Sequence, residues 1–386
     1  MPKRKYRIGV DARLAGKQHA GIGRYIENLL ITLAEIQTKN IEWFFFFYDR
    51  QQADEFQQIL TKHHHITFVY APIRHYSLAE QIQWPKILKE YRLDLLHVPH
   101  FNIPIFYSGK IVVTIHDLLW HQQIGPAATT LSGWKYYLKY LAYRLVTNQA
   151  VRRAAKIFVP AQTVKKTALT YYPQAEEKIV VTKEGIAPVF KKTLQALQQN
   201  PDEAINRQRI NQLIYVGSLY PHKNIEIVLK ALPKLPNITL KIVCSRNVFF
   251  ERTQKLVQQL NLSQQVIFTG YLNDDELVKE INHSLALVQP SKSEGFGLTG
   301  IEAMACGTPV IASDIPIFSE IYAQIPYYFH PEKVDDFIQA FLKLQQRKDY
   351  ANKIKRGYQQ AGQYDWQQMT QLIFKEYSSL LPHDSN

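Results

Sequence analysis

The stretch LALVQPSKSEGFGLTGIEAMACGTPVIAS, from Leu285 to Ser313, has the pattern of a strand, a glycine-rich loop, a helix and a second strand. Both apolar runs lack alternation with polar residues, which is typical of strands that are covered on both faces in a parallel sheet. The small-residue segment between them predicts a helix that begins near Leu298 or Thr299. In doubly wound sheets, ligands bind beyond the carboxyl ends of the strands. The loop that contains Glu294 is therefore expected to carry functional residues.

The same alternation of short apolar runs and helix-length segments extends along the whole chain. In the first half, strands are expected at Arg7–Val10, Trp43–Tyr48, Ile66–Tyr70, Leu95–Val98, Lys110–Ile115, Lys156–Val159 and Ile179–Thr182. In the second half, they are expected at Gln212–Val216, Thr239–Val243, Val266–Thr269, Ala286–Gln289, Pro309–Ala312 and Pro326–Phe329. This repetition predicts two Rossmann-like, doubly wound α/β domains that face a central cleft. The polar stretch Thr193–Gln212 predicts a linker with a short helix, which divides the chain into domains at residues 1–190 and 191–364.

Length and composition agree with two globular domains and no export. The chain has 386 residues, of which 46% are hydrophobic. Because a domain typically has about 100 to 200 residues, this length suggests two domains. The only apolar run near the start, Ile8–Val10, is too short for a signal-peptide core, and no apolar run approaches the roughly 18 residues of a membrane span. Cys244 and Cys306 lie in apolar contexts and are expected to be reduced thiols. These features predict a cytoplasmic protein.

The positive charge is concentrated in the first half of the chain. Residues 1–190 contain 25 Lys and Arg against 14 Asp and Glu, a net charge of +11, whereas the remaining residues carry +2. Such a field suits nucleic acid, an anionic membrane surface or phosphorylated substrates. No zinc-finger spacing, RNP-like aromatic run or basic region with heptads is present, so we expect no nucleic-acid partner. The basic segment from Trp134 to Lys156 could touch an anionic membrane, with Arg152, Arg153 and Lys156 as the expected contacts.

Several residues that could bind an anion follow predicted strands. Gly21 and Gly23 open a helix after the first strand, where backbone N–H groups can approach an anion, although a tight packing turn would also need glycine. His116 directly follows the strand IVVTI, as either a functional or a solvated loop histidine. In YVGSLYPHKN, a strand ends at Gly217 and the chain delivers Lys223 near a helix start, where a cation can face phosphate.

The loop around Glu294 completes a description of a ligand. Gly295 and Gly297 leave backbone amides free to approach an anion, whereas Glu294 and Glu302 can accept hydrogen bonds only from donors such as sugar hydroxyls. Two acidic groups that flank an amide nest fit a ligand with hydroxyl groups at both ends and phosphate in the middle. The residues therefore indicate a nucleoside diphosphate sugar.

These segments resemble the retaining GT-B glycosyltransferases of family 4, also called group 1. The E-x7-E motif from Glu294 to Glu302 lies in EGFGLTGIEAMACGTPVIAS, and GIGRY, HVPHFNIP, TIHDL, KEGIAP, LIYVGSLYPHKN and VIFTGYLNDDEL follow in the family's order. The resemblance covers nearly the full length. It implies that the last helix, within residues 365–386, crosses back to the first domain. It also implies that the first domain holds the acceptor and the second the nucleotide sugar.

The resemblance also implies a role for each matching residue. Glu294 would bind donor-sugar hydroxyls, Glu302 the ribose, Lys223 the pyrophosphate, and His116 would lie beside the sugar ring as the third catalytic residue with Glu294 and Lys223. Ser218 stands where the family commonly has an arginine, and Arg246 is the candidate substitute. Thr299 replaces a frequent proline and keeps an N–H group. The full donor-binding set is Gly21, Gly23, Ser218, Lys223, Arg246, Tyr271, Leu272, Glu294, Gly295, Phe296, Gly297, Leu298, Thr299 and Glu302.

The implied reaction is transfer of a hexose with retention of anomeric configuration. No DxD motif is present, so neither a metal nor another cofactor is expected to be required. YVGSLYPHKN resembles the version in bacterial mannosyltransferases of envelope polysaccharide assembly, which favours GDP-mannose over UDP-glucose, UDP-galactose or UDP-GlcNAc. The implied acceptor is a glycan or a lipid-linked glycan, the latter reached by an enzyme that is peripheral on the inner face of the membrane. Other readings are a GT-B epimerase, a phosphorylase, or a membrane-surface or nucleic-acid binding protein with a degenerate donor site.

Overall fold

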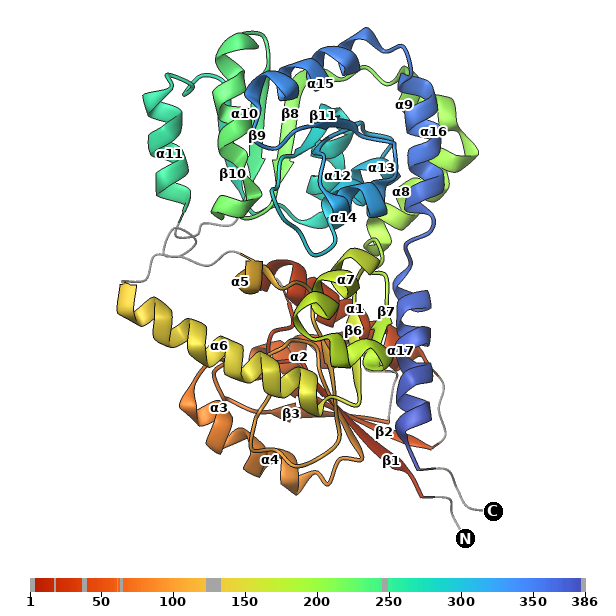
Figure 1. The fold of residues 1–386 in the computed structure, drawn as a ribbon. Coiled ribbons are helices and arrows are strands. Elements are labelled where there is room, and N and C mark those ends of the chain that lie inside the picture. Colours follow the sequence, from red (N-terminus) through yellow and green to blue (C-terminus); the bar gives the residue numbers. More distant parts are fainter. Residues whose placement is uncertain are drawn as a thin grey trace. The chain divides into compact units, whose positions relative to one another are not determined.

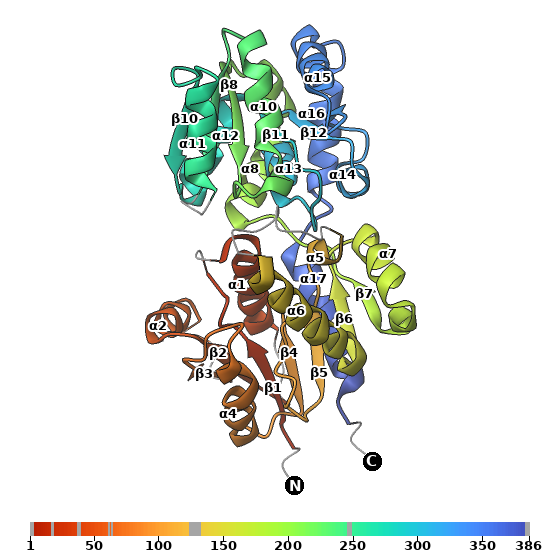
Figure 2. The same ribbon diagram turned by 60° about the vertical axis from the view of Figure 1, so that its left-hand side comes forward.

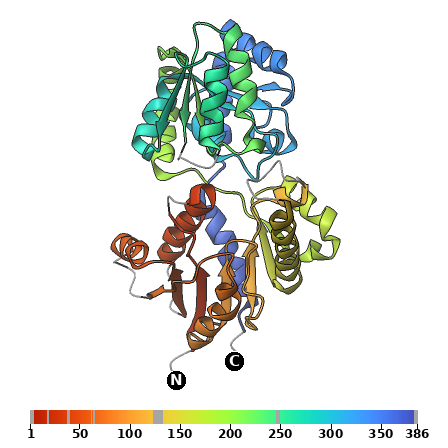
Figure 3. The ribbon, with the colours of Figure 1, turned by 90° about the vertical axis from the view of Figure 1, so that its left-hand side faces the viewer.

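The computed structural model describes residues 4–16, 19–36, 40–60, 62, 65–122, 133–244 and 249–382. The chain forms two compact units (Figure 1). Unit 1 contains Met1–Trp120, Leu131–Glu184 and Trp366–Asn386, and unit 2 consists mainly of Gly185–Asp365. Each unit is a parallel sheet with helices on both faces (Figure 3).

Unit 1 is built on a seven-stranded parallel sheet with the order β3-β2-β1-β4-β5-β6-β7. Its strands are β1 (Tyr6–Asp11), β2 (Ile41–Phe47), β3 (Ile66–Tyr70), β4 (Leu95–Val98), β5 (Ile111–Thr114), β6 (Lys156–Val159) and β7 (Ile179–Val181). The helices are α1 (Ala20–Glu35), α2 (Arg50–Ile59), α3 (Leu78–Ile82), α4 (Trp84–Glu90), α5 (Leu119–Gln122), α6 (Gly133–Arg153) and α7 (Gln162–Tyr171), with a 3₁₀ helix at Pro173–Lys178. The strand order reverses between β1 and β4, which makes their carboxyl ends the switch point of this sheet.

Unit 2 has a six-stranded parallel sheet with the order β10-β9-β8-β11-β12-β13. Its strands are β8 (Ile210–Val216), β9 (Thr239–Val243), β10 (Val266–Gly270), β11 (Ser284–Gln289), β12 (Val310–Ser313) and β13 (Tyr327–Phe329). The helices are α8 (Pro188–Gln199), α9 (Pro201–Asn206), α10 (Ile225–Ala231), α11 (Phe250–Gln259), α12 (Asp274–His283), α13 (Leu298–Ala305), α14 (Pro316–Tyr322), α15 (Val334–Gln346) and α16 (Tyr350–Ala361). This is the nucleotide-binding strand order, with its switch point between β8 and β11.

The last helix, α17 (Trp366–Leu380), belongs to unit 1 and packs against α1 (Figure 2). The hydroxyls of Thr32 and Thr370 hydrogen-bond at 2.5 Å. On the sheet side, the Tyr377 hydroxyl lies 2.5 Å from Nδ1 of His97, whose Nε2 lies 2.9 Å from Thr114 Oγ1. Burial, and then the charge of His116, lower the pKa of His97 to about 3, so its imidazole is neutral. The C-terminal helix is thus anchored by packing and by buried polar contacts.

All thirteen predicted strands are present, with ends that differ by at most two residues. The segment Thr193–Gln212 contains a short helix, α9, as predicted, but its assignment as a linker is wrong, since most of α8 and the start of β8 also lie in it. Helix α8 buries Phe190, Leu194 and Leu197, which recur at helical spacing, and it begins with Pro188 at its first turn. That apolar periodicity outweighs the polar composition of the segment.

Two further expectations can be compared with the structure. Cys244 and Cys306 are both free and buried, as predicted. Of the three basic residues expected to face a membrane, Arg153 donates hydrogen bonds to the carbonyl oxygens of Ile105 and Tyr107. Lys156 pairs with Glu376 of α17 at 2.9 Å. Both side chains therefore have partners within unit 1, and the membrane contact expected of them stays a prediction. Within the described part of the chain, no helix combines the length and apolar character needed to cross a bilayer.

Candidate functional site

Lys223 and Glu294 meet at the switch point of unit 2. Lys223 ends the 3₁₀ helix Pro221–Lys223 after β8, and Glu294 lies in the loop after β11, the neighbouring strand. Lys223 Nζ donates to both carboxylate oxygens of Glu294, at 2.7 Å and 2.6 Å. The side chains are 22% and 11% exposed, so the pair is mostly withdrawn from water. Sheet topology therefore unites two residues that the sequence places 71 positions apart.

The charge state of Glu294 depends on this pairing. Burial by itself would raise its pKa, but the Lys223 charge and hydrogen bonds hold the pKa of Glu294 below its ordinary value. Ser291 Oγ also donates to Glu294 Oε1 at 2.7 Å. At neutral pH, Glu294 is consequently a carboxylate, able only to accept hydrogen bonds.

Hydrogen bonds between neighbouring loops fix the position of Lys223. Asn224 adopts the left-handed conformation, with φ of 57°, and its Nδ2 donates to the carbonyl oxygens of Pro290 and Pro331, at 2.9 Å and 2.8 Å. Lys292 N donates to His222 O at 2.7 Å. The loops after β8 and β11 are thereby joined on either side of the Lys223–Glu294 pair, which favours a preformed site.

The glycine-rich turn brings the backbone to the start of α13. Gly297, the N-cap residue of this helix, has φ of 97°, and a Cβ there would lie 2.3 Å from the Tyr322 hydroxyl. That hydroxyl is 2.5 Å from both Gln289 Oε1 and Gly297 O. Only glycine meets both requirements. The turn therefore presents the N-terminal end of α13, whose first N–H groups have no partner within the helix.

The rest of the predicted loop set lies along this turn. Phe296 is buried, with its ring 5.4 Å from that of Tyr364, whereas Gly295, Leu298 and Thr299 are partly exposed. Glu302 is fully buried, one turn into α13. Solvent thus reaches the start of the helix but not the Glu302 side chain.

The other predicted donor-binding residues of unit 2 are more dispersed. Ser218 is partly exposed, and its carbonyl oxygen accepts a hydrogen bond from the Tyr215 hydroxyl. Tyr271, 53% exposed, and Leu272 follow β10, which is separated from β8 by β9. Arg246 lies outside the described residues.

In unit 1, the two predicted glycines have different surroundings in the first turn of α1. A Cβ on Gly23 would lie 1.9 Å from Gly16 O, so close packing alone requires glycine there. A Cβ on Gly21 would meet no atom within 4 Å, and the residue is exposed. Packing therefore explains Gly23 but not Gly21.

His116 is held between two acceptors at the carboxyl end of β5. Its Nδ1 is 3.4 Å from Glu184 Oε1, and its Nε2 is 3.2 Å from Pro99 O. The Tyr25 ring packs edge-on against it, with centroids 4.6 Å apart. The sequence analysis missed Glu184. It lies just after β7, and a position just after a strand is the same signal that identified His116 after β5.

A buried ionic network was also missed. Arg13, 1% exposed, donates to both carboxylate oxygens of Asp11 and, at 2.9 Å, to Glu80 Oε1, and its guanidinium lies 4.5 Å from the Trp84 ring centroid. Glu80 also accepts from Asn102 Nδ2 at 2.6 Å. All of these side chains are buried, which indicates that the network shapes the loops after β1 and β3.

Among the described residues, no cluster of three or more His, Cys, Asp or Glu could hold a metal ion.

Comparison with solved structures identifies the fold. Sucrose-phosphate synthase from Thermosynechococcus elongatus superposes with a TM-score of 0.74 over 97% of this chain and 99% of that one, at 17% identity. Two doubly wound units of this kind are the GT-B fold of glycosyltransferases. The two Rossmann-like, doubly wound domains predicted from the sequence are confirmed.

Family models identify the protein more closely. The model for Glycosyltransferase Family 4 matches residues 19–189, and that for Glycosyl transferases group 1 matches residues 198–360. The chain belongs to this glycosyltransferase family and is a transferase. The O-antigen chain mannosyltransferase RfbU of Salmonella typhimurium is 28% identical over 74% of this chain and 74% of its own length. The O-antigen chain mannosyltransferase B of Escherichia coli is 24% identical over 93% of this chain and 96% of its own length.

Proposed function

We propose that this glycosyltransferase moves mannose from GDP-mannose, with retention of configuration, to a glycan or lipid-linked glycan. The observation that carries the proposal is the Lys223–Glu294 pair at the switch point of unit 2. It combines a cation for phosphate with a carboxylate for sugar hydroxyls in one preformed place. The names of the two mannosyltransferase relatives support mannose as the sugar.

The site would bind the donor through complementary charge. Lys223 would contact the pyrophosphate, and the amides of Phe296, Gly297, Leu298 and Thr299 would support the phosphate and sugar. Glu294 would accept hydrogen bonds from sugar hydroxyls, for which its lowered pKa keeps it ionised. Because Lys223 already contacts Glu294, a donor phosphate would share this cation with the carboxylate.

Catalysis would be mainly electrostatic. The bond between the anomeric carbon and the diphosphate breaks, a bond from that carbon to the acceptor oxygen forms on the same face, and the acceptor proton passes to the departing diphosphate. Lys223 and the amides at the start of α13 would stabilise the negative charge that develops on the leaving group. His116, oriented by Glu184, would lie beside the sugar ring.

The proposal also assigns roles to residues away from the Lys223–Glu294 pair. Glu302 is fully buried, so contact with the ribose would require approach to the second turn of α13. Tyr271 and Leu272 would offer backbone groups to the base. Arg246 would supply the cation that Ser218 does not, and Arg246→Ala should weaken GDP binding by about 1.5 to 3 kcal/mol. Calorimetry that gives an unchanged affinity would remove Arg246 from the site.

The donor is tested with a panel of nucleotide sugars. GDP-mannose should raise the melting temperature and undergo slow hydrolysis, whereas UDP-glucose, UDP-galactose and UDP-GlcNAc should do neither. Nuclear magnetic resonance of the released or transferred sugar should show the anomeric configuration of the donor. Preference for a UDP-sugar would overturn the donor assignment, and an inverted product would overturn the mechanism.

A further inference from the structure

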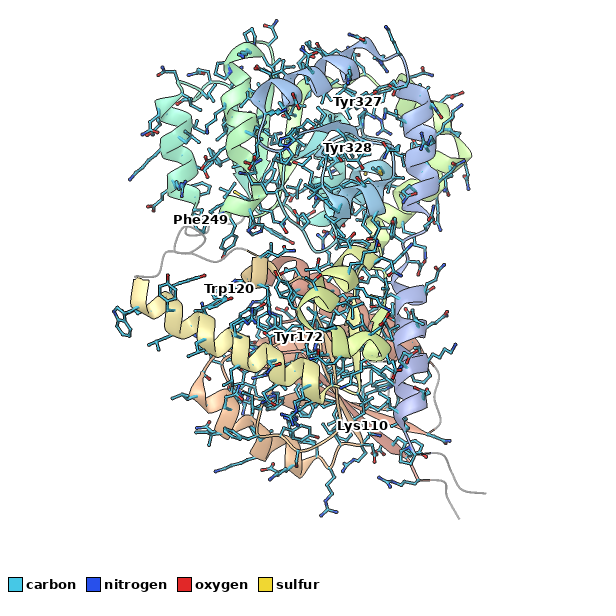
Figure 4. All side chains as sticks on the ribbon, in the orientation of Figure 1. Lys110, Trp120, Tyr172, Phe249, Tyr327 and Tyr328 are labelled. Atoms are coloured by element: carbon cyan, nitrogen blue, oxygen red, sulfur yellow. The ribbon has the colours of Figure 1, made fainter. Side chains whose placement is uncertain are left out.

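Helix α6 is apolar on two opposite faces. One face packs into unit 1 through Tyr136, Tyr143, Thr147 and Ala150, which are at most 8% exposed. Tyr143 lies 5.0 Å from the Phe101 ring and 5.5 Å from the Trp120 ring, between centroids. Trp120, labelled in Figure 4, lies close to this helix. These contacts fix the rotation of α6 about its axis.

The opposite face is apolar and exposed. Trp134, Leu138, Leu141 and Leu145, here called the α6 stripe, are 66%, 59%, 65% and 54% exposed. They recur at i, i+4, i+7 and i+11, and at about 100° per residue their mean direction is roughly opposite to that of the buried face. Tyr137, 60% exposed, lies beside the stripe. A row of this kind is more than scattered surface leucines and indicates an interaction surface.

Three more exposed apolar side chains lie on segments that are joined to each other and to α6. Leu78 and Ile82 of α3 are 82% and 55% exposed, and Phe106 is 69% exposed. Gln81 of α3 bonds the backbone at Ile103 and Ile105, and Arg153 of α6 donates to the carbonyl oxygens that flank Phe106. The segments are thus fastened together as one part of unit 1.

The charge of α6 is of one sign. Between Gly133 and Arg153, the sequence has five basic residues, Lys135, Lys139, Arg144, Arg152 and Arg153, and no acidic one. Lys139 Nζ lies 5.3 Å from the Trp120 ring centroid, beside the buried face. A flank of cations next to exposed leucines and a tryptophan matches helices that lie in the interface of an anionic bilayer.

We propose that the α6 stripe inserts into the interfacial region of an anionic phospholipid bilayer, with Lys135 and Arg144 close to the headgroups. This inference adds a docking surface to the proposed enzyme. The use of that surface in the cell rests on the proposed function, because a lipid-linked acceptor would lie in the membrane. The stripe spans 11 residue steps, about 16 Å, which suits a helix that lies in the plane of the interface. Self-association through the same face would bring the cations of two copies together without an opposing acid on the helix, so the charge favours lipid.

The test measures co-sedimentation with vesicles of phosphatidylcholine alone or mixed equally with phosphatidylglycerol. The full chain should bind only the mixed vesicles and dissociate as salt rises, since screening acts within about 10 Å at 0.1 M. Leu138→Glu with Leu141→Glu should lower the partition coefficient by more than about tenfold. Lys135→Glu with Arg144→Glu should remove the preference for phosphatidylglycerol. Leu342→Glu, at an exposed leucine of α15, is the matched control and should bind as the parent does.

Three results would overturn the proposal. The first is that the parent does not bind mixed vesicles at low salt, and the second is that the Leu138/Leu141 variant binds them as well as the parent. The third is that light scattering shows the parent as a dimer and this variant as a monomer. Thermal melting identifies misfolded variants, and single Leu141→Gln then replaces the double change. Donor hydrolysis should be the same in all variants. If the parent does not hydrolyse the donor, the proposed function is contradicted but the vesicle result is not affected. The two failures are therefore distinguishable.

Discussion

Lys223 Nζ lies within 2.7 Å of both carboxylate oxygens of Glu294, so one ammonium group neutralises the carboxylate that is proposed to bind the sugar. Ser291 Oγ also donates a hydrogen bond to this carboxylate, at 2.7 Å. Because both members of the pair are mostly buried, removing either one changes the charge and solvation of the other. The consequences for binding and for stability can be measured separately.

Glu294→Gln should separate sugar transfer from diphosphate binding. The amide retains the size of the side chain but loses the negative charge, which leaves Lys223 free to pair with phosphate. We expect sugar transfer to fall by about 100-fold or more, while GDP binds as well as before or several-fold more tightly. Steady-state rates and calorimetry give the two values. A parallel loss of both would assign Glu294 to the pyrophosphate or to folding.

Lys223→Met should make stability depend on pH in a defined direction. In the parent, the pKa of Glu294 lies below the ordinary 4.5, so its contribution to stability is present above that pH and is lost as pH falls through the lowered value. Without Lys223, burial dominates and raises the pKa, so the variant loses stability as pH rises through the raised value. The stability gap between parent and variant should therefore begin to widen below pH 4.5 and grow towards neutrality, to about 1.5 to 3 kcal/mol.

A double variant provides the control for this experiment. Adding Glu294→Gln to Lys223→Met removes the unpaired carboxylate, so part of the lost stability should return at neutral pH and none at acid pH. Urea unfolding at several pH values measures the gap. A gap that does not change with pH would mean that Lys223 stabilises the protein through its packing.

The sheets were predictable because their strands are apolar on both faces, and burial on both sides is the only arrangement that suits such runs. Topology then placed Lys223 and Glu294 in one site, but their direct pairing depends on loop geometry fixed by Asn224, which no local pattern reveals. The sequence likewise could not predict whether a basic side chain faces solvent or donates to a carbonyl oxygen, because such partners lie far away along the chain. Arg153 is the example, since its partners lie 46 and 48 residues away.

Glu184→Gln should lower turnover with little effect on donor affinity. Glu184 lies 3.4 Å from His116 Nδ1 and is proposed as a positioning residue for that ring. A loosened ring should reduce kcat by about 10- to 100-fold, while the donor KM stays within twofold. Glu177→Gln, at an exposed glutamate of the same unit, is the matched control. An equal fall for the control, or a change confined to KM, would contradict the positioning role.

Gly21→Ala and Gly23→Ala should have opposite effects, although the two residues share the first turn of α1. A methyl group on Gly23 would lie 1.9 Å from Gly16 O and 3.2 Å from Leu14 O, so the loop must move, and we expect a loss of about 1 to 3 kcal/mol in unfolding free energy. A methyl group on Gly21 meets open space, and alanine favours the helix by up to about 1 kcal/mol, so stability should be kept or raised.

Activity of the Gly21→Ala variant then tests whether Gly21 contacts the donor, as expected from the sequence. If the open space at Gly21 receives part of the donor, this stable variant should show a donor KM raised by about tenfold or more, since one lost close contact to phosphate has that effect. Thermal melting and initial rates on the same preparations give both quantities. A stable variant with unchanged kinetics would remove Gly21 from the donor site. A Gly23→Ala variant as stable as the parent would show that the Gly16 loop yields without cost.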